Sequence, residues 1–176
     1  MPIVSPNTRI RHPDAFEIGP NSIVDDYCYF STQVRIGDWS HVASGCSVAG
    51  GADRLFTLGS FSSLSSGVKV WCTSDDFVND MVTIVPSELG EIKENVVSGD
   101  VLIGDYTAVG ANSVVMPRNE LPEGCAVGAL SLVQADAGLE PWTVYAGIPA
   151  RPIASRNRES VLRQVEQFQA RLAARS

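Results

Sequence analysis

The sequence predicts an all-β solenoid, in which short parallel strands coil around one apolar core, followed by a single C-terminal helix. An apolar residue recurs every six residues through most of the chain, and a small side chain stands four residues after most of these positions. The 15 Gly and 10 Pro suit a fold with many tight corners. A simple strand has a period of two and a helix a period of 3.6, so neither alone explains a period of six.

The apolar positions form three runs, all Ile, Leu or Val apart from one Phe. They are Ile18, Val24, Phe30, Ile36, Val42 and Val48, then Leu58, Leu64 and Val70, then Val97, Ile103, Val109, Val115, Leu121, Val127 and Val133. A short strand followed by a corner accounts for each hexad, and three hexads close one triangular coil. The branched residue then fills the interior and the small one fits the corner. We expect about five such coils, stacked as in other β-solenoids.

The cysteines fit this pattern better than a redox or metal site. Cys28, Cys46 and Cys125 stand in the small-residue column, where they act as small apolar side chains. Cys72 lies where the repeat breaks, and we expect it to be partly exposed. The chain has no CxxC pair and no zinc spacing.

Two interruptions and a tail depart from the repeat. Residues 50–57 add four residues, which we expect to protrude at a corner. Residues 71–96 form a long, acidic excursion with apolar side chains, and such an excursion from a rigid scaffold is usually functional. The period fades after Val133, and from Ser155 apolar residues at spacings of three and four predict a helix. We expect residues 1–154 to form the solenoid domain and residues 155–176 a helix that packs on the solenoid or on neighbouring copies of it in a trimer.

Composition excludes several classes of protein. Thirteen basic and 20 acidic side chains give a net charge of −7, which argues against broad nucleic-acid binding. No apolar run approaches the length of a membrane span, and the first residues lack the layout of a secretion signal. We therefore expect a cytoplasmic protein.

The hexads end in a segment that carries a family resemblance. The run YAGIPAR at 145–151 resembles the ending of the hexapeptide-repeat acyltransferases, which fold as left-handed β-helices. More narrowly, three segments are similar to acetyltransferases of bacterial surface-polysaccharide pathways, including lipopolysaccharide. They are HVASGCSVAGG (41–51), SSGVKVWCTSDDF (65–77) and AVGALSLV (126–133) with LEPWTVYAGIPA (139–150). The resemblance implies a homotrimer in which acetyl-CoA, the co-substrate, lies between the solenoids of neighbouring subunits. It also implies a sugar or nucleotide-sugar acceptor near the long loop.

The sequence departs from the family at two histidine positions. Thr32 occupies the place of the catalytic His of related sugar N-acetyltransferases. Asp75 stands about where the galactoside and xenobiotic branches carry theirs. A mechanism therefore cannot be transferred from those branches without change.

Only two histidines could act as the base that acetyl transfer to a hydroxyl requires. His12 precedes Pro13 in the non-repetitive start, and we expect it to be a surface residue. His41 ends a hexad at an outward position within the family-like segment HVASG, so it is the candidate general base. Asp75 and Asp76 open the long loop. We expect one of them to orient His41 or to bind the acceptor's hydroxyl or amine.

The resemblance also implies a coenzyme site on the last coils, where small residues and backbone line the pantetheine channel. The corresponding positions are Gly110, Ala111, Gly128, Ala129 and Ser131. Arg151, with Arg118 as a helper, is expected to meet a phosphate. Tyr145 and Trp142 are expected to anchor the tail rather than to stack on adenine.

The sequence thus favours an acetyl-CoA-dependent sugar acetyltransferase with His41 as base, and no metal. Three alternatives remain at this point. One is N-acetylation of a nucleotide-linked amino sugar without a protein base. Another is a non-catalytic assembly subunit. A third is a γ-class carbonic anhydrase, whose site needs three histidine ligands where this chain has two histidines in all.

Overall fold

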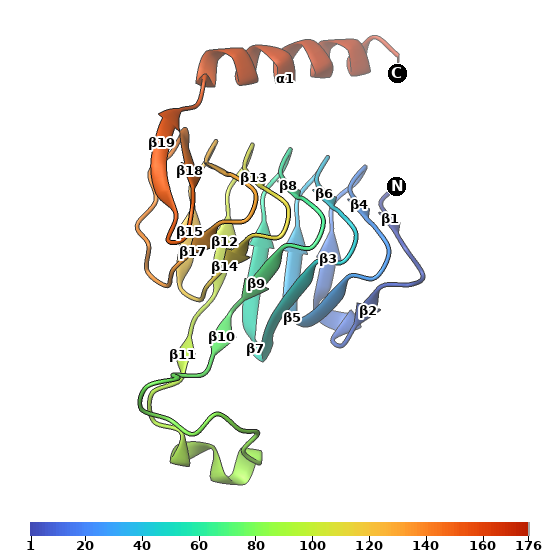
Figure 1. Cartoon of the computed structure of the whole chain (residues 1–176). Coiled ribbons are helices and arrows are strands. Elements are labelled where there is room, and N and C mark those ends of the chain that lie inside the picture. Colours follow the sequence, from blue (N-terminus) through green and yellow to red (C-terminus); the bar gives the residue numbers. More distant parts are fainter. Residues whose placement is uncertain (176) are drawn as a thin grey trace.

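In the computed structural model, which describes residues 1–175, the chain is a parallel β-solenoid of about seven turns with one helix alongside it (Figure 1). The cross-section has three sides, so we name its faces in chain order. The first face is an eight-stranded sheet. Its strands are β1 (Ile3–Val4), β4 (Ile23–Val24), β6 (His41–Val42), β8 (Ser63–Leu64), β13 (Ala108–Val109), β16 (Ala126–Val127), β18 (Thr143–Ala146) and β19 (Arg151–Ser155).

The second and third faces share a nine-stranded sheet, because β5 and β7 run on from one face to the next. Its strands are β2 (Arg9–Ile10), β3 (Phe16–Ile18), β5 (Tyr29–Ile36), β7 (Ser47–Leu58), β9 (Lys69–Trp71), β12 (Val101–Ile103), β14 (Val114–Val115), β15 (Asn119–Leu121) and β17 (Leu132–Val133). The other elements are a hairpin of β10 (Thr73–Ser74) and β11 (Val97–Ser98), the 3-10 turns η1 (Pro13–Ala15) and η2 (Ser87–Ile92), and α1 (Arg158–Ala173).

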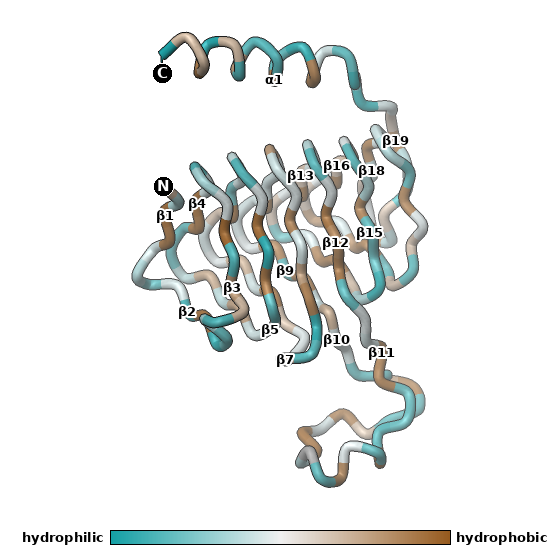
Figure 2. The backbone as a smooth tube through the Cα atoms, turned by 180° about the vertical axis from the view of Figure 1, so that it is seen from behind, coloured by the Kyte–Doolittle hydropathy of each residue, from teal (hydrophilic) through white to brown (hydrophobic). Residues whose placement is uncertain are grey.

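The predicted apolar columns form the core. On the first face, parallel pairing places one side chain per coil in a single buried column: Val4, Val24, Val42, Leu64, Val109, Val127 and Tyr145. We number the seven coils by these residues. All but Val4 are buried, and Figure 2 shows hydrophobic segments along the strands with hydrophilic ones between them. The expected all-β parallel helix with a long excursion and a C-terminal helix is confirmed.

The solenoid is longer at both ends than the expected five coils. At the start, Val4 pairs with Val24 and Ile10 with Phe30, at a spacing of 20 residues instead of 18. Two extra residues around η1 put these strands out of phase with the later hexads, which hides the first coil from a strict count of six. At the other end, Tyr145 pairs with Val127, so an aromatic residue continues the apolar column.

The first interruption lies within a strand. β7 runs through it, with a shift in register, and residues 51–53 are exposed as expected of a protrusion. The residue that returns to the interior is Phe56, which pairs with Val34 and Val101 and is fully buried. Ala52, which stands in the small-residue column by count, is exposed instead.

Two expectations around the second interruption are wrong. Val97 pairs with Ser74 in the antiparallel hairpin and is only partly buried. The chain returns to the core at Val101, which is buried. Cys72 is fully buried, because the chain still follows the path of the coil at this residue, with the side chain pointing inward, and leaves the coil only after it. Burial raises the pKa of Cys72 to about 12, so its thiol stays protonated at neutral pH.

Buried hydroxyl groups hold one corner of successive coils together. Ser22 Oγ donates to the Gly37 carbonyl at 2.6 Å and accepts the Ser40 N–H at 2.9 Å. Ser40 and Ser62 repeat both bonds toward the following coils. Each hydroxyl therefore has a donor and an acceptor partner, which offsets the cost of burying it.

The three edges of the solenoid carry different additions. The helix edge, between the third and first faces, lies under α1: Trp39 and Phe61 make edge-on contacts with Phe168, with ring centroids 4.8 and 6.0 Å apart. The insertion edge, between the second and third faces, carries both interruptions. The longer one, residues 75–96, we call the arm (Figure 1). The remaining edge, between the first and second faces, is the site edge described below. No helix among residues 1–175 is both long and apolar enough to cross a bilayer.

The buried Phe56 gives a test of the shifted register. Phe56→Ala removes a fully buried ring from the closely packed interior and should lower the free energy of unfolding by about 3–5 kcal/mol in chemical denaturation. Leu102→Ala, at an exposed position on the neighbouring strand β12, is the control and should cost less than about 1 kcal/mol. Equal losses in the two variants would show that Phe56 does not fill the interior.

Candidate active site

The site edge consists of residues 25–27, 43–45, 65–67, 110–112 and 128–130, one short corner on each of the second to sixth coils. Backbone hydrogen bonds join these corners: Gly45 N–H donates to the Asp26 carbonyl, Gly67 N–H to Ser44, Asn112 N–H to Ser66 and Leu130 N–H to Ala111, at 2.9–3.0 Å. Because each corner lies directly on the next, groups far apart in sequence line one straight edge. Four of the five predicted small coenzyme residues, Gly110, Ala111, Gly128 and Ala129, belong to it.

His41 stands beside this edge on the third coil. It is the first residue of β6, between Ile23 and Ser63 of the neighbouring strands, and its side chain points outward with 47% of its surface exposed. Its Nε2 lies 2.9 Å from Asp25 Oδ2, on the second coil. If Nε2 carries the ring proton and donates it in a hydrogen bond to this carboxylate, the neutral ring keeps a free lone pair on Nδ1.

The 18-residue period could have identified Asp25 as the partner of His41, although the sequence analysis did not select Asp25 as a site residue. Residue 23 is the in-register neighbour of residue 41, and Asp25 lies two residues on. Because side chains alternate along a strand, Asp25 returns to the outward side that Ile23 and His41 share. An outward carboxylate at this place is therefore the diagonal neighbour of His41.

Asp75 and Asp76 do not meet His41 within one chain. Asp75 forms an ion pair with Lys93, and Asp76 accepts the Val78 N–H at 2.7 Å and the Asn79 side-chain amide at 2.6 Å. These bonds lower the pKa of Asp76. The arm leaves the insertion edge, which is opposite the first face, where His41 lies. The carboxylate partner of His41 inside the chain is Asp25.

The arm is held in shape by bonds between its two ends. Lys93 Nζ binds the Asp75 carboxylate and the Thr83 carbonyl, the latter at 2.8 Å, and only 10% of the Lys93 side chain is exposed. Asp80 accepts the Asn95 backbone and side-chain N–H groups at 2.9 and 3.1 Å. Six acids and one Lys leave the arm strongly negative: Asp75, Asp76, Asp80, Glu88, Glu91, Glu94 and Lys93.

The expected coenzyme residues differ in what they can offer. Gly110 N–H donates to the Val127 carbonyl, and a Cβ on Gly110 would come within 2.4 Å of the Ala129 nitrogen, so only Gly fits there. Ser131 is buried, and its hydroxyl accepts the Gly147 N–H at 3.1 Å. The Ser131 side chain therefore stabilises the corner from inside and is not available to a ligand, whereas Ala129 is exposed at this part of the edge.

The two expected phosphate ligands also differ. Arg118 makes a double hydrogen bond to Asp136, with Nε and Nη2 at 3.0 and 2.7 Å from Oδ2, and this bond raises the pKa of Arg118 and lowers that of Asp136. Arg151 is exposed at the start of β19 and lines a hollow with residues 134–140 and Tyr145. Its guanidinium is the better placed of the two for an incoming anion. Tyr145 accepts the Glu140 N–H at 2.8 Å and Trp142 stacks on Tyr106, so both anchor the tail as expected.

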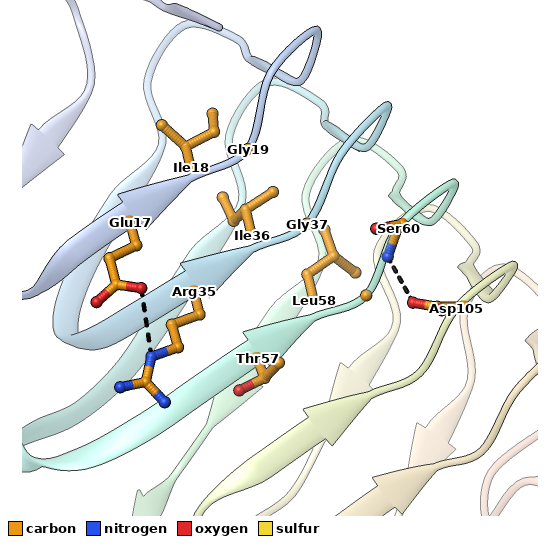
Figure 3. Close-up of a pocket in the computed structure, with 11 residues that line it drawn as sticks. Glu17, Ile18, Gly19, Arg35, Ile36, Gly37, Thr57, Leu58, Ser60 and Asp105 are labelled. Carbon is orange, nitrogen blue, oxygen red and sulfur yellow. Dashed lines mark hydrogen bonds and ion pairs between the residues drawn. The ribbon is translucent and has the colours of Figure 1, made fainter.

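A second groove, on the third face, holds none of the expected site residues (Figure 3). Its polar groups bind one another: Glu17 faces Arg35 at 3.5 Å, and the Ser60 N–H donates to Asp105 at 2.7 Å. The glycines at its upper border let neighbouring coils approach, since a Cβ on Gly59 would come within 2.5 Å of the Asp105 carboxylate. We assign this groove to coil packing. Within residues 1–175, no group of three or more His, Cys, Asp or Glu side chains is placed to hold a metal ion.

Comparison with known proteins adds independent information. No protein-family model matches the chain. It is 35% identical over 151 residues to the dTDP-4-amino-4,6-dideoxy-D-glucose acyltransferase of Escherichia coli, spanning 83% of this chain and 74% of that protein. The chain belongs to the hexapeptide-repeat sugar acyltransferases. Its solenoid is accordingly a left-handed β-helix, and the protein is an acyltransferase.

Solved structures agree with this assignment. The chain superposes on AntD, an N-acyltransferase from Bacillus cereus in complex with dTDP and 3-hydroxybutyryl-CoA, with a TM-score of 0.83 and 31% identity. The match covers 97% of this chain and 89% of AntD. A hexapeptide-repeat acetyltransferase from Vibrio cholerae, at 21% identity and a TM-score of 0.64 over 82% of this chain and 76% of that one, shares the fold.

The Lys93 bonds predict how the arm responds to mutation. Lys93→Met removes the buried ammonium group that joins Asp75 to Thr83, so the arm should open and chymotrypsin should cleave within residues 75–96 at least about fivefold faster. The melting temperature of the solenoid should change by less than a few degrees.

Lys69→Met is the matched control, because Lys69 binds the Gly45 carbonyl on the solenoid and not on the arm. It should leave the rate of arm cleavage unchanged. Equal cleavage rates in the wild type and Lys93→Met would contradict a structural role for this bond.

Proposed function

We propose that the protein N-acylates an amino sugar carried on a nucleotide, with a coenzyme A thioester, acetyl-CoA in the first instance, as donor. The observation that carries this proposal is the match with AntD over 97% of the chain at 31% identity, since AntD is an N-acyltransferase. Another AntD structure contains dTDP-4-amino-4,6-dideoxyglucose and coenzyme A. The Escherichia coli relative is named for the acylation of the same amino sugar.

The site edge offers a path for the coenzyme. Ala129 lies on the sixth coil and His41 on the third, so three strand spacings of about 4.8 Å separate them by about 14 Å along the axis. The residues between are small: Ser63 and Ala108 on the first face, and Ser65, Ser66, Gly110 and Ala111 at the edge. An extended pantetheine arm along this strip would bring its thioester to His41. Arg151 would neutralise a phosphate at the far end. Arg118 lies on the insertion edge, between β14 and β15, and does not line this path.

His41 is the proposed general base. Its Nδ1 accepts a proton from the acceptor nitrogen as that nitrogen attacks the thioester carbonyl. The C–S bond then breaks, and the coenzyme thiolate takes up a proton. Asp25 holds the ring by accepting a hydrogen bond from Nε2–H, and its negative charge stabilises the imidazolium that forms. The aspartate of a Ser-His-Asp triad acts in the same way on its histidine.

Asp75 and Asp76 can act in this site only from a second copy, because the arm leaves the edge opposite the first face. We propose a homotrimer in which the arm of one subunit lies over the His41 site of the next, where its negative charge attracts the ammonium form of the acceptor. The bound ammonium group releases one proton to solvent before its nitrogen attacks the thioester. The exposed apolar side chains of the arm support contact with another copy. They include Phe77, Val78, Met81, Val82 and Ile84.

An O-acetyltransferase is the second candidate. The chain is 30% identical over 140 residues to the putative lipopolysaccharide biosynthesis O-acetyl transferase WbbJ of Escherichia coli, across 76% of this chain and 63% of WbbJ. A hydroxyl acceptor needs a base at least as much as an amine does, so His41 and Asp25 suit it too. Either acceptor is consistent with a cytoplasmic role in making surface polysaccharide.

Thiol release from acetyl-CoA measures the reaction directly. The wild type should release thiol with dTDP-4-amino-4,6-dideoxyglucose and should not do so with the same sugar lacking the amino group. His41→Gln should lower kcat by about 10²–10⁴-fold, with the KM for acetyl-CoA within about threefold of the wild type. Asp25→Asn should lower kcat less.

Two results would contradict these assignments. Thiol release with a hydroxyl sugar alone would favour the O-acetyltransferase. Full kcat in His41→Gln would mean that no histidine base operates. His12→Gln is the matched control, because His12 lies beside η1, away from the site edge, and it should keep full activity.

Co-expression tests whether the site is shared between copies. If His41→Gln and the double variant Asp75→Asn/Asp76→Asn are each inactive alone, mixed trimers should regain about a quarter of the wild-type activity. A quarter is expected because a random mixture joins an intact His41 to an intact neighbouring arm at one site in four. No recovery in trimers confirmed by light scattering would contradict a site that is shared between copies.

A further inference from the structure

Among residues 1–175, ten residues other than Gly have a positive φ, between 53° and 61°, where side chains are rarely tolerated. The fold imposes this conformation at its corners, since Gly45, Gly67 and Gly124 adopt it at equivalent places in other coils. Gly or Asn satisfies the corner at the least conformational cost. A bulky residue there therefore calls for an explanation.

Residue type accounts for two of the ten and contacts account for six. Two are Asn: Asn21 and Asn112. Four are aromatic residues of the helix edge, which contact Phe168 or stack on one another: Trp39, Phe61, Tyr106 and Trp142. The last two, Arg118 and Asp136, form the double hydrogen bond. Tyr27 and Leu130 remain.

Tyr27 and Leu130 have no side-chain hydrogen bond, ion pair or ring contact within residues 1–175, and they are 74% and 67% exposed. Both lie on the site edge. They stand at its two ends, on the second and sixth coils, and the three coils between carry the small residues Gly45, Gly67 and Asn112. Over these five coils the edge is thus a low strip with one large exposed side chain at each end.

The position of His41 assigns an end to each substrate. Leu130 directly follows Ala129, at the end where the coenzyme is proposed to enter. Tyr27 lies one coil beyond His41, on the side away from the coenzyme residues. It is four residues past Ile23, the neighbour of His41, and two residues past Asp25, whose carboxylate lies 2.9 Å from His41 Nε2. Tyr27 therefore borders the His41 site at the corner of the adjoining coil, where a part of the acceptor beyond its reacting sugar can lie.

We propose that Tyr27 is a binding residue for the acceptor, and that its ring packs against the nucleobase of the nucleotide sugar. An aromatic side chain can stack on any of the nucleobases, because every base presents a π-face. The exposed ring and its unfavourable φ are then both explained by a ligand that covers the ring. This inference rests on the proposed function, since it requires a nucleotide-linked acceptor.

The test uses the full-length protein and two readouts. Tyr27→Asn keeps a residue that suits the positive φ and removes the ring, whereas Tyr27→Phe keeps the ring. In calorimetry with dTDP, Tyr27→Asn should raise the Kd at least about tenfold and Tyr27→Phe less than threefold. In the thiol-release assay, Tyr27→Asn should raise the KM for dTDP-4-amino-4,6-dideoxyglucose to a similar extent. The KM for acetyl-CoA should stay within twofold.

Leu130→Asn is the matched control, because it removes a similarly exposed side chain at a similar φ from the other end of the strip. It should leave the Kd for dTDP unchanged. The proposal is overturned if Tyr27→Asn binds dTDP as the wild type does, or if it raises the KM for acetyl-CoA instead. It is also overturned if Tyr27→Asn lowers the melting temperature or dissociates the assembly, since Tyr27 is then a contact between subunits.

Failure of the proposed function gives a different result. A wild type that binds dTDP but acylates no amino sugar would refute the N-acyltransferase assignment and leave the Kd comparison intact. A wild type that does not bind dTDP at all would overturn the role of Tyr27.

Discussion

The in-register stacking of one coil on the next is the constraint on which the rest of the structure depends. Each inward side chain rests on its equivalent in the next coil, 18 residues away where nothing is inserted, as Val24 does on Val42 and Val109 on Val127. Because every coil repeats the same path, an outward residue also lies directly beside its equivalents in the neighbouring coils. A short local pattern therefore becomes a long straight edge, which is how His41 and Ala129 come to line one strip.

The same stacking decides where the chain can vary. An insertion inside a coil would break the core, so both interruptions leave at one edge and the chain resumes in register at Phe56 and Val101. The helix edge uses its positive-φ positions for aromatic residues that contact α1. The site edge keeps small residues between Tyr27 and Leu130. Three edges of one repeat have thus acquired three tasks: covering by the helix, projection of the arm, and the proposed binding of substrates.

The period of six predicts the fold well, because packing at a corner depends on single residue types that recur. It fails where the phase changes: at η1, which hides the first coil, and at Val97, which keeps the spacing but lies in a hairpin. The candidate site was predicted less completely. His41 could be selected as an outward histidine, but its partner Asp25 requires contacts across coils, and the bond of Asp75 to Lys93 depends on how the arm folds back on itself.

The coenzyme and the acceptor are proposed to meet at His41 along the site edge. A crystal structure of the protein with coenzyme A and dTDP-4-amino-4,6-dideoxyglucose would show where they lie. We expect the pantetheine to lie over residues 110–111 and 128–129. The thiol sulfur should lie within about 4 Å of the sugar nitrogen, and that nitrogen should lie within hydrogen-bond reach of His41 Nδ1. A thiol placed over the third-face groove near Arg35 and Asp105, or a sugar nitrogen out of reach of His41, would contradict it.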